Sequence, residues 1–183
     1  MSVRRESNRG FTLVELMAVV AIVGILATLA TYGVNKYIQS SKSSEAIQML
    51  GAIKAAQESY RSETFVYKDV SGTKSLAAGG FYPQTTPSPT AYQWGDASTD
   101  QGKAYRELGV VADAPVRFVY GCAAGAASDN VPTPGMTVTN WPSTVQQPWY
   151  VVEALGDLDG DKVYSTFVSS SFAGRIFIDK EGE

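Results

Sequence analysis

The chain has 183 residues and a formal net charge of −3, with no histidine and with Cys122 as its single cysteine. These counts exclude the commonest general base, the commonest ligand of catalytic zinc, an intrachain disulfide and a thiolate metal cluster. The acidic balance argues against nucleic acid as a direct partner, because phosphate contacts need clustered Lys and Arg. Since the sequence also has no nucleophile motif and no phosphate-binding glycine loop, we expect no enzymatic activity.

The N-terminal segment joins a basic, polar stretch to a long apolar run. Residues 1–10 contain Arg4, Arg5 and Arg9, and residues 16–35 carry no charge. A helix of about 20 residues spans roughly 30 Å, the thickness of the hydrocarbon core of a bilayer. The run is longer than the apolar core of an ordinary secretory signal, so it predicts a membrane-spanning helix. The preceding basic residues favour a cytoplasmic N-terminus.

A single carboxylate, Glu15, lies at the start of this apolar segment. An ionised side chain deep in a bilayer costs on the order of 2.5 to 3.5 kcal/mol or more. We therefore expect Glu15 to have a partner. A glutamate that merely marks the membrane boundary is the alternative interpretation.

The sequence around Glu15, GFTLVELM over residues 10–17, resembles the prepilin cleavage and methylation motif of type IV pilins and of the pseudopilins of type II secretion systems. The resemblance implies that a prepilin peptidase cuts between Gly10 and Phe11 and that the new amine of Phe11 is methylated. It also implies that Glu15 neutralises the Phe11 amine of a neighbouring subunit in a filament. Such a pair attracts more strongly at low dielectric than in water, although desolvation offsets much of the gain.

Beyond residue 34 the chain becomes polar without any turn signal, and apolar residues recur at spacings of three and four. This spacing places them on one stripe of a helix that continues to about Glu63. We expect this stripe to pack against the C-terminal domain. Its members are Tyr37, Ile38, Ala46, Met49, Leu50, Ile53, Ala56 and Tyr60.

The remaining sequence predicts a small antiparallel sheet with long loops. Density of Gly and Pro indicates loops from residue 65 to about 100 and over 123–148, with a short helix at 103–108 between them. Segments rich in Val, Phe, Tyr or Ile predict strands at 116–122, 149–155, 163–169 and 174–179, of which the last three are expected to form a meander.

The expected fold class is therefore α+β and, by the resemblance, pilin-like: a long N-terminal helix packed by its second half on a sheet of about four strands. We divide the chain into a leader peptide (1–10), a membrane or filament-core half of the helix (11–34), an amphipathic half (35–63) and a globular head domain (64–183).

Three carboxylates at alternate positions, Asp157, Asp159 and Asp161, lie between two predicted strands. They resemble the first half of a calcium loop, which needs converging oxygen ligands. The match then fails, because the sixth and twelfth positions, where an EF-hand has Gly and Glu, hold Lys162 and Val168. An acidic hairpin turn is the alternative. We expect no required cofactor, with calcium as the candidate metal at these three residues.

The resemblance implies a structural subunit, major or minor, of a type IV pilus. Its expected partners are other pilin copies, prepilin peptidase, the pilus assembly machinery and the inner membrane, where the precursor is anchored with its N-terminus in the cytoplasm. A pseudopilin of a type II secretion system, in a periplasmic pseudopilus, is an alternative, and the single cysteine departs from many pilins whose C-terminal loop is closed by a disulfide. A membrane-anchored binding domain that does not polymerise is a third interpretation. Adhesion, motility, DNA uptake and secretion are left open.

Overall fold

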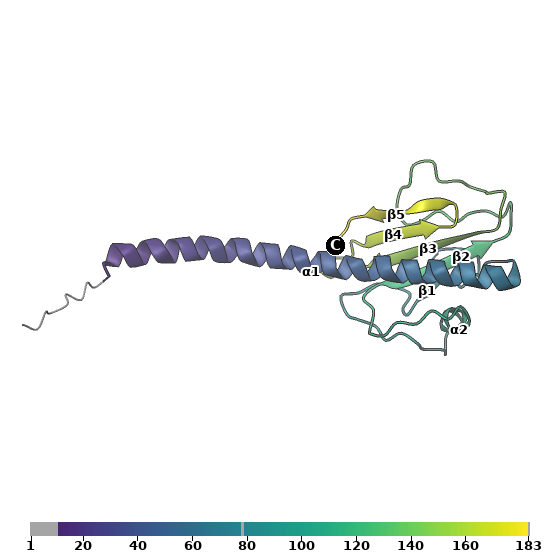
Figure 1. The fold of residues 1–183 in the computed structure, drawn as a ribbon, viewed down its shortest axis with the longest axis horizontal. Coiled ribbons are helices and arrows are strands. Elements are labelled where there is room, and N and C mark those ends of the chain that lie inside the picture. Colours follow the sequence, from purple (N-terminus) through teal and green to yellow (C-terminus); the bar gives the residue numbers. More distant parts are fainter. Residues whose placement is uncertain (1–10, 78, 183) are drawn as a thin grey trace, which may run out of the picture. The chain divides into compact units, whose positions relative to one another are not determined.

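The computed structural model describes residues 11–77 and 79–182, and the chain divides into two compact units, Met1–Ile38 and Gln39–Glu183. The predicted leader therefore lies outside the described residues. The elements, in chain order, are α1 (Leu13–Thr64), β1 (Phe81–Tyr82), α2 (Asp100–Glu107), β2 (Val119–Gly125), β3 (Trp149–Gly156), β4 (Ser165–Ser170) and β5 (Ala173–Asp179) (Figure 1). This layout confirms the predicted α+β class.

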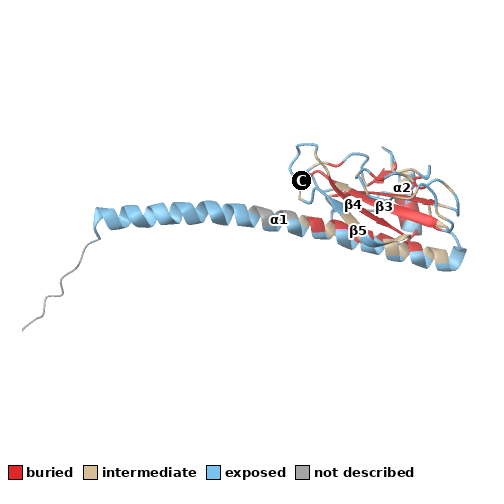
Figure 2. Cartoon of the chain, turned by 90° about the horizontal axis from the view of Figure 1, so that it is seen from above, coloured by how far each residue is buried: buried red, intermediate tan, exposed pale blue. Residues whose placement is uncertain are grey.

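In the first unit, the side chains of α1 from Leu13 to Val34 are mostly apolar and all exposed. Its stretch Leu13–Val34 has 22 residues, about 33 Å at the rise of an α-helix, and none of it is buried (Figure 2). The hydroxyls of Thr28 and Thr31 donate to the carbonyl oxygens of Ile25 and Ala27 of the same helix, both at 2.7 Å. These two threonine hydroxyls are thus satisfied within the helix, as a lipid environment requires.

In the second unit, α1 packs on the sheet through the predicted stripe. Ala46, Met49, Leu50 and Ile53 are buried in the main core, and Ala56 and Tyr60 pack against it partly buried. Helix α1 ends at Thr64, one residue beyond the predicted end. Tyr37 and Ile38, which also belong to the predicted stripe, are exposed and lie in the first unit.

The sheet has the order β1-β2-β3-β4-β5, and every neighbouring pair is antiparallel. The prediction of four strands missed β1, which has only two residues and pairs with β2 about 40 residues later along the chain. The predicted strand at 116–122 is shifted, because β2 begins at Val119, while Val116 forms an isolated bridge with Tyr92. Helix α2 begins earlier than predicted because the Thr99 side chain caps it by accepting the Gly102 N–H at 3.0 Å.

Both faces of the sheet are covered. One face packs on α1 through the main core, which includes Tyr120 and Tyr150, and the other face carries a second cluster around Trp149 and Val151. Trp141 and other residues of the predicted 123–148 loop pack on this second cluster. Because both faces are covered, the inner strands are buried almost throughout and do not alternate between buried and exposed residues.

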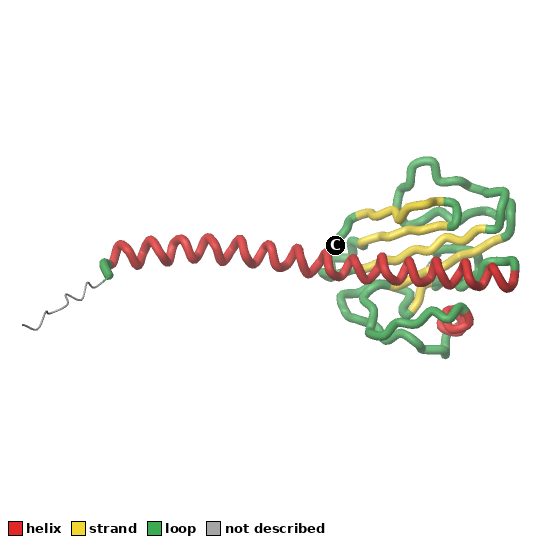
Figure 3. Tube along the Cα trace, in the orientation of Figure 1, coloured by secondary structure: helices red, strands yellow, loops and turns green. Residues whose placement is uncertain are grey.

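Figure 3 shows the long loops that lie beside the helix and the sheet. Two buried polar side chains attach such loops to this framework. Gln57 of α1 donates to the Lys68 carbonyl oxygen at 2.7 Å and accepts the Lys68 N–H at 2.9 Å. Glu153 of β3, only 1% exposed, accepts the Gly135 N–H at 2.6 Å. Each bond joins an element of regular structure to a segment that has none.

Candidate functional site

The start of α1 is organised by a reciprocal pair of hydrogen bonds between Thr12 and Glu15. The Glu15 Oε2 accepts the Thr12 N–H and the Thr12 hydroxyl, both at 2.8 Å, while the Thr12 Oγ1 accepts the Glu15 N–H at 3.3 Å. This arrangement is a capping box, in which two backbone N–H groups at the helix N-terminus are satisfied by side chains. Both residues are exposed, and so is Phe11, which precedes the helix and is 88% exposed.

The capping box fixes the direction of the Glu15 side chain. Its carboxylate accepts the N–H of Thr12, the residue that follows Phe11. The resemblance places the new amine on Phe11. The structure therefore positions Glu15 and Phe11 near one helix end, while Gly10 lies outside the described residues. Sequence reasoning singled out Glu15 but missed Thr12, although Thr-x-x-Glu ahead of an apolar run is the pattern of a capping box.

These features define a class of protein: within the described residues, one helix is long and apolar enough to cross a membrane, is capped at its N-terminus and continues into an α+β domain. Residues 5–31 match the family model of the prokaryotic N-terminal methylation motif. The chain thus carries the prepilin-type signature of type IV pilins and pseudopilins, which confirms the resemblance. No curated protein and no solved structure matches the chain.

The signature has general implications for the processing, assembly and membrane anchoring of the chain. It implies processing by a prepilin peptidase and assembly into pilus-like polymers in general. Together with the exposed apolar stretch Leu13–Val34, it is consistent with membrane anchoring.

The three predicted calcium ligands are brought together in the turn between β3 and β4. Ligand oxygens of Asp157, Asp159 and Asp161 lie within 4.8 Å of one another, with Asp157 buried and the other two exposed. Each carboxylate also accepts a backbone N–H of the same turn; the Gly160 N–H, for example, lies 2.7 Å from Asp157 Oδ1. These bonds hold the acidic hairpin turn without an ion, and calcium binding stays a prediction.

Two buried groups with perturbed pKa values, Glu153 and Cys122, lie in the sheet. Burial raises the pKa of Glu153 to about 7 against the opposing effect of the Gly135 N–H. Burial likewise raises the pKa of Cys122 to about 12, against a hydrogen bond from Gln57. A thiol with so high a pKa is a poor nucleophile. Glu153 thus attaches the loop at Gly135 to the sheet, and the Cys122 thiol of β2 accepts its hydrogen bond from Gln57 of α1.

Proposed function

We propose that the chain is a structural subunit of a type IV pilus, cut between Gly10 and Phe11, methylated at Phe11 and polymerised through the apolar half of α1. The observation that carries the proposal is the methylation motif at residues 5–31, which overlaps an exposed and predominantly apolar helical stretch of 22 residues, Leu13–Val34. So much exposed apolar surface needs lipid before assembly and protein neighbours after it. The proposal assigns no catalytic residue and no required cofactor.

In this proposal the precursor waits in the inner membrane with its N-terminus in the cytoplasm. The second unit, Gln39–Glu183, lies outside the cytoplasm and becomes the exposed part of the filament. Glu15 then has two roles. It caps its own helix through Thr12, and it receives the methylated amine of Phe11 from the next subunit, so that neither charge is left alone in a low-dielectric surrounding.

Mass spectrometry of the protein from cells with an active prepilin peptidase tests the processing step. The expected N-terminal residue is methylated Phe11, and the expected product of a peptidase-deficient strain retains the leader ahead of Phe11. An intact leader in the strain with active peptidase would contradict the proposal.

Substitution at Glu15 separates its two roles. Glu15→Gln keeps an oxygen that accepts the Thr12 N–H but removes the charge, whereas Glu15→Ala removes both. If charge pairing drives assembly, both variants insert into the membrane and neither forms filaments as the sole copy. Glu63→Ala, at an exposed glutamate near the other end of α1, is the matched control and should assemble normally. Normal filaments from Glu15→Gln would refute the charge pairing.

A pseudopilin of a type II secretion system would share the cleavage, the methylation and the dependence on Glu15. The location of the filaments distinguishes the two: sheared surface fibres containing this chain support the pilus, and its abundance in them separates a major from a minor subunit. The third interpretation, an anchored binding domain that never polymerises, requires that no filament contains the chain.

A further inference from the structure

A large apolar side chain projects into solvent directly after α1. In the described part of the second unit, Phe65 is the most exposed large apolar residue, at 82%, and its neighbour Val66 is 53% exposed. Phe65 has φ +64°, and its N–H donates to the Arg61 carbonyl oxygen at 2.8 Å. This is the left-handed helix end that glycine normally occupies, because a side chain strains it.

Hydrogen bonds on both sides fix this conformation. The Thr64 hydroxyl lies 2.8 Å from the Tyr60 carbonyl oxygen and 3.0 Å from that of Val66. In the usual form of this helix end, an apolar residue packs back onto the last turn, whereas Phe65 is left largely uncovered. In an isolated chain, phenylalanine therefore has two disadvantages at this position: its backbone is strained, and its apolar side chain is exposed to water. A contact with another molecule would remove the second disadvantage.

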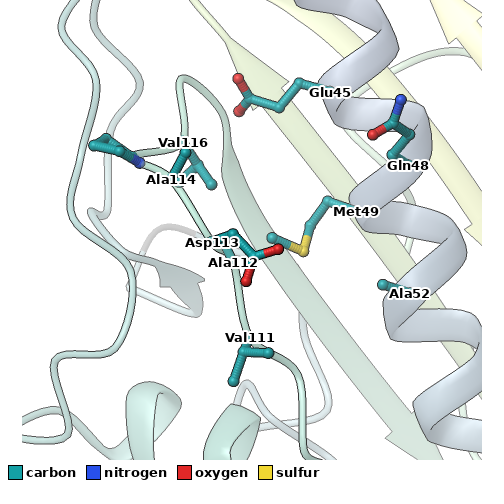
Figure 4. A pocket seen from close by; sticks show the side chains of 10 residues that line it. Glu45, Gln48, Met49, Ala52, Val111, Ala112, Asp113, Ala114 and Val116 are labelled. Atoms are coloured by element: carbon teal, nitrogen blue, oxygen red, sulfur yellow. The ribbon is translucent and has the colours of Figure 1, made fainter.

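A pocket that suits such a side chain lies elsewhere on the same unit. It has a volume of about 310 Å³ and lies between α1 and the segment 111–116 (Figure 4). Figure 4 shows Met49 extending from α1 toward this segment. Met49 and Val116 are buried, while Val111 is 73% exposed, second only to Phe65 among the large apolar residues described in this unit. Among the large apolar residues described in this unit, the two most exposed are thus the projecting residue and a residue that lines the pocket.

The polar groups of the pocket complement an aromatic ring. Glu45 and Asp113 line it. The Glu45 Oε1 accepts the Arg117 N–H at 2.7 Å, and partial burial raises the pKa of Glu45 against the effect of this bond. The edge of an aromatic ring carries partial positive charge, so a phenylalanine that enters edge-on toward these carboxylates is electrostatically favoured.

We propose that Phe65 of one subunit inserts into the pocket at Met49 and Val111 of a second copy of this chain. Phe65 follows Met49 by 16 residues, about 24 Å along the helix axis, so it cannot reach its own pocket. The projecting residue and the pocket are different surfaces, and each subunit therefore donates one contact and accepts another. Such head-to-tail contacts produce open helical filaments if the rotation does not close. The inference rests on the proposed function and names a contact of that filament.

The Phe65→Gly variant separates docking from folding. Glycine relieves the strained backbone, so the variant's Tm in detergent micelles should equal or exceed that of the unmodified chain. Filament yield should nevertheless fall by about tenfold or more, because the buried apolar contact is lost. Ile178→Ala, at another exposed apolar residue (41%), is the matched control and should keep normal filament yield. Normal yield from Phe65→Gly overturns the proposal.

Cysteine cross-linking tests the partner surface. Oxidised filaments of the chain carrying both Phe65→Cys and Val111→Cys should give a ladder of dimers, trimers and longer oligomers. Each single variant should give none, since its partner position lacks a thiol and Cys122 is buried. Phe65→Cys paired with Thr133→Cys, an exposed loop position, is the control pair. Filaments that form without a ladder overturn the contact and leave the proposed function standing, whereas the absence of filaments from the unmodified chain overturns both.

Discussion

Replacing Glu153 by glutamine is expected to remove a pH dependence of stability. The carboxyl group is 1% exposed, and burial raises its pKa from 4.5 to about 7 although it accepts the Gly135 N–H. The folded protein thus favours the protonated acid, and the unfolded chain ionises near the ordinary value. Below about pH 4.5 both states are protonated and burial of the group carries no ionic penalty. As pH rises from about 4.5 to 7, stability is lost, and above pH 7 the loss is complete.

The size of this effect follows from the two pKa values. At about 1.4 kcal/mol for each pH unit between them, the shift from 4.5 to about 7 corresponds to about 3 kcal/mol of folding free energy at pH 8. For a chain of this length that is roughly 6 to 12 °C in Tm. Glutamine is uncharged and its oxygen still accepts the Gly135 N–H, so the Glu153→Gln variant should be more stable than the unmodified chain at pH 8 and similar to it at pH 4.5.

Thermal unfolding of the full chain in detergent micelles, followed by near-ultraviolet circular dichroism, measures this difference. The unmodified chain and Glu153→Gln are compared at intervals from pH 4.5 to 8, so that titration of every other group cancels. The two Tm curves should diverge as pH rises, with the variant above. Parallel curves over this range would show that the ionisation of Glu153 is not coupled to folding.

The remaining predictions concern the loops, the second core and the acidic turn. Gln57→Leu should reduce the free energy of unfolding in urea by about 2 kcal/mol or more, because it leaves both backbone groups of Lys68 without their partner; an unchanged midpoint would contradict this. Gly125→Ala should lower the Tm by an amount that corresponds to about 1 to 3 kcal/mol, because its Cβ would lie 2.5 Å from the buried Trp149 ring. If Asp157 and its two neighbouring carboxylates bind calcium, added calcium should raise the Tm and EDTA should reverse the rise; a Tm that responds to neither would leave the backbone N–H bonds as the support of this turn.

The helices and most of the sheet could be predicted because their signals are local. The uncharged run before residue 36 and the apolar stripe after it indicate a long helix by period and length alone. Strand β1 gives no such signal, since Phe81 and Tyr82 are two residues between Gly80 and Pro83 that become a strand only by pairing with β2. The register of β2 also depends on distant residues. Val116 pairs with Tyr92 in an isolated bridge, whereas β2 begins three residues later, at Val119.

Functional residues that belong to a sequence motif could be predicted. Residues whose properties depend on burial in the folded protein could not. Glu15 is conspicuous as a carboxylate in an apolar run, and its partner Thr12 is readable from the Thr-x-x-Glu pattern once a helix start is assumed. In the sequence, nothing distinguishes Glu153 from any other acidic residue of a predicted strand. Its raised pKa depends on the loop around Gly135 that closes over the second face of the sheet.

The energetics of the proposed assembly place unusual weight on the contacts outside the membrane. When the apolar half of α1 moves from lipid into a filament core, it exchanges one apolar surrounding for another, so the hydrophobic effect provides little driving force for that half. Net stabilisation must come from groups that are more stable in the filament than in the single subunit. The Glu15 carboxylate is stabilised by a cation at low dielectric. The Phe65 side chain is stabilised by removal from water, and burial of a phenylalanine contributes about 1.5 to 3 kcal/mol. Repeated in every subunit, a contact of this size raises the equilibrium constant for the addition of each subunit about tenfold or more.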